Sequence, residues 1–145
     1  MQGCLFCAIA HGDVPSHRVC ETDELVAFLD IQPLRPGHAL IVPRAHHDYF
    51  DDLPERLAAD IVVLGQKLGR AMKQIYAAPR VAFAFMGFDV PHAHAHVVPV
   101  FDKTDITSRR AIVEEKITFR APPRASEEEL AAGAKNLLAA LAAHG

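Results

Sequence analysis

Residues 92–100 read HAHAHVVPV, so three histidines alternate with two alanines ahead of a valine-rich end. In a β-strand the side chains at i, i+2 and i+4 point to the same face, roughly 7 Å apart per step. The pattern therefore predicts a strand over 92–100 in which His92, His94 and His96 share one face. The small alanines on the opposite face would let a helix or a second sheet approach closely.

Three interpretations of these imidazoles are open: a histidine-rich surface strand, a set of metal ligands, or a site of nucleophilic catalysis. A surface strand is disfavoured because the histidines lie inside an otherwise apolar segment. Imidazole is the commonest nitrogen ligand for metals. A neutral imidazole, available near pH 7 because its reference pKa is about 6.5, can also attack phosphorus through one ring nitrogen. Neighbouring imidazoles can then donate protons and stabilise phosphoryl oxygens.

The remaining pattern predicts an α+β domain with a mainly antiparallel sheet, one long central helix and a C-terminal helix. Strands are expected at 17–21, 25–30, 39–43, 80–86 and 92–100, with a turn at 32–38. The long helix is expected over 54–76, with Asp52 as a cap-like side chain and Pro79 as its stop. Its buried face would consist of Leu57, Ile61, Leu64, Leu68 and Ile75.

The C-terminal part of the chain, 104–145, is expected to form a loop and a helix. Residues 102–125 are polar and indicate loop, with a candidate short strand at 116–120. The segment SEEE at 126–129 fits a capping box, which would open an alanine- and leucine-rich helix that ends near Ala143.

Composition limits the class of protein. The chain has 145 residues, 50% of them hydrophobic and 23% charged, which predicts a single globular domain over 1–145 with its core at 4–103. The net charge of −3 and the lack of a long basic run argue against a nucleic-acid partner. No apolar stretch is long enough for a membrane span, and no secretory signal pattern is apparent, so a cytoplasmic location is expected.

The histidine segment belongs to a wider set of motifs. His92 to Val98 matches the pattern His-φ-His-φ-His-φ-φ, in which φ is apolar. Other segments follow in a consistent order and spacing, namely CLFC at 4–7, AFLDI at 27–31, GH at 37–38 and LIVPRAH at 40–46. Together they resemble the histidine triad (HIT) family, in its bacterial form with an N-terminal CxxC. The resemblance implies a HIT-like fold and a homodimer that pairs sheets edge to edge.

The resemblance also implies a reaction at the α-phosphate of a nucleotide. His94 occupies the position of the histidine that attacks phosphorus and forms a covalent nucleotidyl-histidine. His96 would assist at the phosphate oxygens, and His92 would order the site from the other side. The expected enzyme is a nucleotide hydrolase or nucleotidyl transferase, acting on a dinucleoside polyphosphate or a nucleoside phosphoramidate. Splitting one difficult displacement into two easier ones is the physical gain.

The implied ligand is a purine nucleotide with an AMP moiety. Asp30 matches the acid that binds the ribose hydroxyls, since a carboxylate can accept hydrogen bonds from both of them. Phe6, Phe28 and Ile31 are candidates to line the base pocket, because an apolar slot suits a purine. Ile9 is a weaker candidate, for which a core position is the better interpretation.

A zinc site is expected near the N-terminus, and no organic cofactor. Cys4 and Cys7 supply one pair of ligands, and the resemblance implies that His46 and His92 complete the set. His47 is the competing choice for the third ligand. The ion would be structural and would leave His94 free. Taken alone, the CxxC pair could also be a redox dithiol or two buried thiols.

One segment departs from the family pattern and keeps other functions open. Gly87 to Pro91 stands where relatives often have Gly-Gln-Ser or Gly-Gln-Thr. Phe88 cannot hydrogen-bond, and the carboxylate of Asp89 would repel a phosphate. Arg109 or Arg110 could compensate, although solvated surface charge is the simpler interpretation of both. A nucleotide-binding adaptor with little turnover is the first alternative function, and a metal-dependent hydrolase is the second.

Overall fold

The computed structural model describes residues 3–106, 125–128 and 130–132. The chain divides into two compact units, 1–112 and 113–145. In the second unit, the described residues at 127–128 and 130–132 are helical, and the Leu130 N–H donates to the carbonyl oxygen of Ser126 over 3.0 Å. The rest of the predicted C-terminal helix, the candidate strand at 116–120, and both Arg109 and Arg110 lie outside the described residues.

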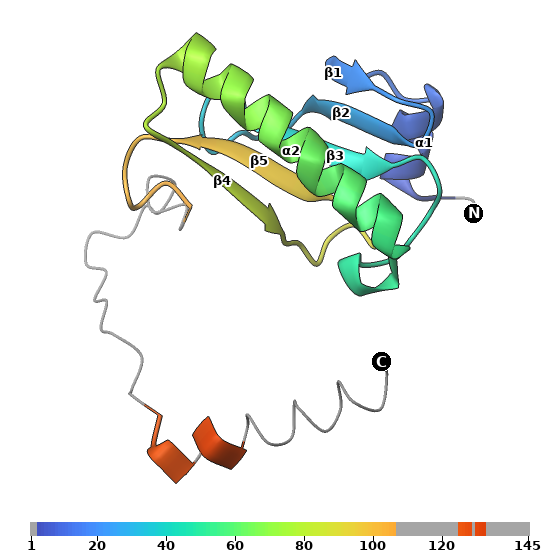
Figure 1. Cartoon of the computed structure of the whole chain (residues 1–145). Coiled ribbons are helices and arrows are strands. Elements are labelled where there is room, and N and C mark those ends of the chain that lie inside the picture. The colour runs from blue at the N-terminus through green and yellow to red at the C-terminus, as the bar shows by residue number, and fades with distance from the viewer. Residues whose placement is uncertain (1–2, 107–124, 129, 133–145) are drawn as a thin grey trace, which may run out of the picture. The chain divides into compact units, whose positions relative to one another are not determined.

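The first unit is built on a five-stranded antiparallel sheet, as predicted. Its strands are β1 (Arg18–Glu21), β2 (Leu25–Leu29), β3 (Ala39–Pro43), β4 (Arg80–Phe85) and β5 (Ala95–Val100). The spatial order is β1-β2-β3-β5-β4, so β1 and β4 form the edges (Figure 1). Every neighbouring pair runs antiparallel. The α+β class and the antiparallel sheet are confirmed.

A helix packs on each face of this sheet. The long helix α2 (Glu55–Tyr76) lies across one face (Figure 1). It shares a core with alternate residues of the strands, among them Ile41 and Val97. The short helix α1 (Leu5–His11) packs against the other residues of the alternation, including Val42. The period of two in the strands therefore sorts side chains between two helical layers.

The predicted ends and face of α2 need two corrections. Pro54 is the N-cap and no side chain caps the helix, because Asp52 belongs to a short 3-10 turn, Phe50–Asp52. Ile75, which was expected on the buried face, is 72% exposed. Residues 73–77 are all exposed, so the last turn of α2 has no buried face. Met72, at 5% exposure, is the last buried residue of the helix.

The helix α1 was not anticipated from the pattern of residues. Phe6, Ile9 and Ala10 are buried at helical spacing, and Gly12 ends the helix with φ +94°. Its N–H donates to the carbonyl oxygens of Ala8 and Ile9, which is the usual arrangement for a glycine at this position. Seven residues are too few to be helical on propensity alone, so the helix depends on its tertiary contacts.

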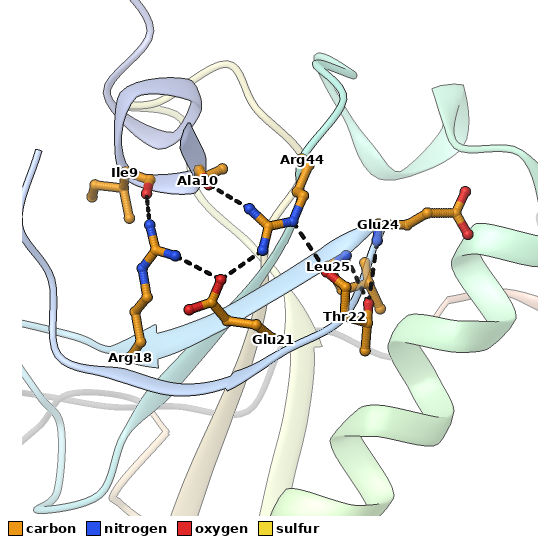
Figure 2. A network of polar contacts seen from close by, with 8 residues as sticks. All are labelled: Ile9, Ala10, Arg18, Glu21, Thr22, Glu24, Leu25 and Arg44. Carbon is orange, nitrogen blue, oxygen red and sulfur yellow. Dashed lines mark hydrogen bonds and ion pairs between the residues drawn. The ribbon is translucent and has the colours of Figure 1, made fainter. Parts of the chain in front are cut away.

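Two arginines fasten the C-terminal end of α1 to the sheet (Figure 2). Arg18 donates to the carbonyl oxygen of Ile9 over 2.8 Å, and Arg44 donates to that of Ala10 over 2.7 Å. Both guanidinium groups also contact Oε2 of Glu21 at 2.6 Å, and Arg18 foremost keeps the pKa of this carboxyl below its ordinary value. Arg44 thus satisfies the Ala10 carbonyl, and Arg18 adds positive charge at the Ile9 carbonyl, which also accepts the Gly12 N–H.

The described residues include no helix that is long and apolar enough to cross a lipid bilayer.

Two glycines on α2 set how closely β4 approaches, and they give a paired prediction. A Cβ at Gly65 would lie 2.5 Å from Cε2 of Phe83, whereas one at Gly69 would lie 3.5 Å from Cγ1 of Val81. We expect Gly65→Ala to lower the free energy of unfolding by about 1–2 kcal/mol, because overpacking outweighs the helix-propensity gain of about 1 kcal/mol. Gly69→Ala should leave it unchanged or raise it by up to about 1 kcal/mol. Urea denaturation of both variants measures this, and equal effects would contradict the packing explanation.

Candidate functional site

A cleft of about 600 Å³ opens on the α1 face of the sheet. Its walls come from α1, from β2 and the residues after it, from the segment after β4, and from two histidines of the HAHAH run. The lining includes Phe6, Phe28, Asp30, Ile31, Asp89, His94 and His96. The cleft therefore brings the expected base-pocket residues, the expected ribose acid and two of the three histidines to one place.

The histidine run is only partly a strand, which corrects the expectation for 92–100. β5 begins at Ala95, because the Ala93 N–H donates to the carbonyl oxygen of His47 over 2.7 Å instead of entering the sheet. The alternation of faces is nevertheless confirmed, since Ala93, Ala95 and Val97 belong to the α2-side core. The rings of the run lie on the α1 side, where the Phe6 ring packs against those of His92 and His94.

The ring of His94 presents one free nitrogen to the cleft. Its Nδ1–H donates to the carbonyl oxygen of His92 over 2.6 Å, and a carbonyl can only accept. Nε2 therefore keeps its lone pair. A Cβ at Gly87, where φ is +123°, would lie 2.8 Å from this Nε2, so glycine leaves the space in front of it clear. This is the arrangement that a nucleophilic imidazole requires.

The tautomer of His96 is fixed by a chain of hydrogen bonds that starts at a main-chain amide. The Leu34 N–H donates to Nδ1 of His38 over 3.2 Å, so the neutral His38 ring carries its proton on Nε2. That Nε2–H donates to Nδ1 of His96 over 2.9 Å. The remaining proton of His96 is then on Nε2, which donates to the carbonyl oxygen of Met86 over 3.2 Å. Burial lowers the pKa of His38 and of His96, which favours these neutral forms.

His92 turns its lone pair away from the cleft. The ring is fully buried, and its Nε2–H donates to the carbonyl oxygen of Pro43 over 2.9 Å. Nδ1 is therefore the acceptor nitrogen, and it lies 3.4 Å from Sγ of Cys4 and 3.5 Å from Sγ of Cys7. Burial lowers the pKa of His92 and raises that of the Cys7 thiol. The tautomer of His92 is the one that a metal ligand needs.

His46 completes a four-membered cluster. Its Nδ1 lies 3.3 Å from Sγ of Cys7, and its Nε2–H donates to Oδ1 of Asp48 over 2.7 Å. The ligand atoms of Cys4, Cys7, His46 and His92 all lie within 4.8 Å of one another. Two sulfurs and two imidazole nitrogens form a donor set that Zn²⁺ takes in tetrahedral geometry, and each imidazole has the outer hydrogen bond that zinc-bound histidines make. The residues present therefore fit a structural zinc ion.

A second cluster, Asp30, His38 and His96, also gathers possible ligand atoms within 4.8 Å. Here the two imidazole nitrogens are 2.9 Å apart, an ordinary N–H···N distance. Two nitrogens bound to one tetrahedral zinc ion would lie about 3.3 Å apart. We therefore interpret this cluster as a hydrogen-bonded relay. His94 belongs to neither of the two clusters found among the described residues.

Comparison with known proteins identifies the family. Residues 11–103 of the chain match the HIT domain family.

The chain is a member of the HIT family.

Several relatives of this HIT protein have been named or solved. It is 36% identical over 101 residues to the adenosine 5′-monophosphoramidase of Saccharomyces cerevisiae, in an alignment that covers 69% of this chain and only 64% of the yeast protein. A Streptococcus mutans structure (SMU.412c) matches with TM-score 0.78 and 29% identity, over 97% of this chain and 87% of that one. A Zn-bound histidine triad family protein from Mycobacterium smegmatis matches with TM-score 0.66 and 31% identity, over 84% of each chain.

The predicted base-pocket residues of this HIT protein differ in how far they are buried. Phe6 and Phe28 are 7% and 3% exposed, and their rings contact edge to face at 5.8 Å. Ile9 lines the cleft and is also buried in the α1-side core. Ile31 is 91% exposed at the rim. In the departing segment, Phe88 is 94% exposed while Asp89 lines the cleft.

Sequence reasoning missed three parts of the site: His38, Gly87 as a spacer, and Asp48 as a partner of His46. His38 had a usable signal, because it belongs to the GH motif at 37–38 and directly precedes β3. The sequence signal for Gly87 was weaker, because a glycine after a strand also marks an ordinary turn. Nothing in the local sequence distinguishes Asp48 from the neighbouring acids at 51 and 52.

Proposed function

We propose that this protein is a nucleotide hydrolase or nucleotidyl transferase that acts at the α-phosphate through a covalent nucleotidyl-His94. The observation that carries the proposal is the free Nε2 of His94, oriented by the His92 carbonyl and left open by Gly87. The name of the yeast relative, an adenosine 5′-monophosphoramidase, supports a nucleoside phosphoramidate as substrate. A dinucleoside polyphosphate is the other substrate class that this chemistry fits.

The cleft can hold the AMP moiety of such a substrate. The base would lie in the apolar part beside Phe6 and Phe28, with Ile31 covering its outer face. Oδ1 of Asp30 accepts the Gln32 N–H over 2.8 Å. Oδ2 lies 3.7 Å from Nε2 of His38, beyond hydrogen-bond distance, so it can accept from the ribose hydroxyls. The buried hydroxyl of Ser16, also in the cleft wall, has no hydrogen-bond partner among the described residues. A rotamer change that turns this hydroxyl, which is closed to solvent here, toward the cleft would let a polar edge of the nucleoside satisfy it.

The reaction would proceed in two displacements. The Nε2 lone pair of His94 forms a bond to phosphorus, and the P–N or P–O bond to the leaving group breaks with its electron pair remaining on that group. An amine leaving group takes one proton from solvent. Water then attacks phosphorus, the N–P bond returns its electrons to His94, and one proton passes to solvent with release of AMP. His96 Nε2–H would turn from the Met86 carbonyl to a phosphoryl oxygen.

Zinc is proposed at Cys4, Cys7, His46 and His92. When bound, the ion supplies a structural cross-link between α1, the residues after β3 and the histidine run. His46 is preferred to His47, because only His46 belongs to the cluster of ligand atoms. No step of the proposed reaction uses the ion, and no organic cofactor is needed.

We also propose a homodimer in the cytoplasm. β4 pairs only with β5 in the described sheet, so its outer edge keeps main-chain donors and acceptors for a second copy. Phe83 on β4 and Val62 on α2 are large apolar residues that remain exposed beside this edge, at 37% and 45%. Pairing of two β4 strands would cover both.

A nucleotide-binding adaptor remains the second candidate, and the position of Asp89 favours it. This carboxylate lines the same cleft as His94 and His96, where it would repel a phosphate dianion. An adaptor would bind AMP and turn over slowly. A metal-dependent hydrolase is less well supported, because His94 lies outside the clusters of possible ligands in the described part of the chain.

The deciding experiment traps the intermediate. The protein is mixed with adenosine 5′-phosphoramidate or a diadenosine polyphosphate, quenched in base, and examined by intact mass spectrometry while AMP release is followed chromatographically. We expect a transient adduct with the mass of one adenylyl group, attached to the peptide that contains His94. Tight AMP binding with neither adduct nor turnover would favour the adaptor and contradict the proposed enzyme.

A further inference from the structure

The segment that carries His94 is fixed without strand pairing. Pairing of β5 with its neighbours begins at Ala95. Ahead of it, the His92 N–H donates to the carbonyl oxygen of Val90 over 2.8 Å, and the Ala93 N–H donates to that of His47 over 2.7 Å. The direction of the His92 carbonyl is therefore set by contacts outside the sheet.

That carbonyl decides which nitrogen of His94 is free. It accepts the Nδ1–H of His94 over 2.6 Å. If the carbonyl turned away, the ring of His94 could rotate and exchange tautomers, and the lone pair would no longer face the cleft. The carbonyl belongs to His92, whose ring is held at Nε2 by Pro43 and at Nδ1 by the two thiols. The orientation of His94 thus depends on a residue of the candidate metal centre.

A second contact links the same two sites. Phe6 lies between Cys4 and Cys7 on α1, and its ring packs edge to face against His94, with centroids 5.0 Å apart. The same ring packs against His92 at 6.1 Å. A shift of the N-terminal end of α1 would therefore change the packing on the face of the His94 ring.

The other end of α1 is held independently of any metal. Arg18 and Arg44 bind the carbonyls of Ile9 and Ala10 and share Glu21, as Figure 2 shows. Loss of the metal would leave this attachment intact. We therefore expect metal loss to loosen the N-terminal end of α1, where Cys4 and Cys7 lie, and His92, while the rest of the helix stays in place.

We propose that metal bound by the four-ligand cluster positions His94, so that Cys4, Cys7 and His46 are positioning residues for the nucleophile. They act through the His92 carbonyl and the Phe6 ring and touch no substrate. The effect on the ring of His94 stands on geometry alone. Its consequence for turnover rests on the proposed function.

The test compares zinc-loaded protein, metal-free protein and the Cys7→Ser variant. Long-range ¹H–¹⁵N correlation spectra report the tautomer of each imidazole without any substrate. We expect one Nδ1–H tautomer for His94 in the loaded protein and a mixture in the other two. In turnover assays we expect kcat to fall about 10–100-fold in the metal-free protein and in Cys7→Ser, by analogy with the loss of other residues that orient a functional group indirectly, while KM changes by less than about threefold. If Cys7→Ser does not fold, His46→Gln removes a ligand near the surface instead.

Arg18→Ala is the matched control, because it loosens the opposite end of α1 and leaves the four ligands untouched. It should lower stability and leave the His94 tautomer and kcat unchanged. An unchanged His94 spectrum in metal-free protein, or an equal loss of kcat in Arg18→Ala, would overturn the inference. A tautomer change on metal loss in a protein that never hydrolyses nucleotides would support the inference and contradict the proposed function.

Discussion

Replacing His94 with alanine should lower kcat for adenosine 5′-phosphoramidate by roughly 10³-fold or more, because of the two HAHAH-run histidines in the described cleft only His94 has a free ring nitrogen for the proposed covalent intermediate. The cleft walls keep the residues proposed to contact the base and the ribose in this variant, so the Kd for AMP should change little. Steady-state AMP release and calorimetric AMP binding measure the two quantities separately.

His11→Ala is the matched control for this substitution. His11 is exposed at the end of α1 and does not line the cleft that holds His94. Its loss should leave kcat within about twofold of the parent, as expected for an exposed residue away from the site. Turnover that survives His94→Ala would disprove the assigned mechanism, and the adaptor and metal-hydrolase alternatives would then be preferred.

Removal of the proposed zinc ion should lower the free energy of unfolding more than any of the substitutions considered above. The cluster joins α1, the segment after β3 and the histidine run. Because the four ligands come together only in the folded chain, the free energy of zinc binding adds to the free energy of folding. We expect chelation to lower the free energy of unfolding by more than about 3 kcal/mol, seen as a fall in Tm that added zinc reverses. Elemental analysis of the purified protein should find one zinc per chain.

Cysteine variants separate this effect from general damage. Cys7→Ser should reproduce the destabilisation and make Tm insensitive to chelator. Cys20→Ser is the matched control, because Cys20 is half-buried on β1 and does not belong to the cluster. It should cost no more than about 1 kcal/mol and should keep the response to zinc. The same Tm with and without chelator in the parent protein would rule out a stabilising metal.

The sheet and the long helix could be predicted because their signals are local. The run ALIVP at 39–43 and the alternation RVAFAF at 80–85 are strands in the structure, and Leu57, Ile61, Leu64 and Leu68 form the buried stripe of α2. The alternation of faces in the HAHAH run could also be predicted, because side chains of an extended segment point to opposite sides in turn even where the segment is not paired in the sheet. The clustering of Cys4, Cys7, His46 and His92 agrees with the ligand set that the family resemblance implied.

What escaped prediction depends on long-range contacts. The helix α1 is too short for propensity to reveal it, and the start of β5 is decided by the Ala93–His47 hydrogen bond across 46 positions. Ile75 has helical spacing but lies in the last turn of α2, which the described residues leave exposed. Residue spacing could not assign the two roles of His92, whose ring faces the thiols while its carbonyl holds His94.

The hydrogen bond from the Leu34 amide to His38 has a consequence for how such sites diverge. The group that fixes the His96 proton is part of the backbone, so it does not depend on which side chain stands at position 34. Any residue except proline supplies the same N–H there. The residue at position 34 can therefore change among descendants of this chain, within the packing limits of a half-buried side chain, while its N–H still serves the candidate site. A search for invariant residues would pass over it.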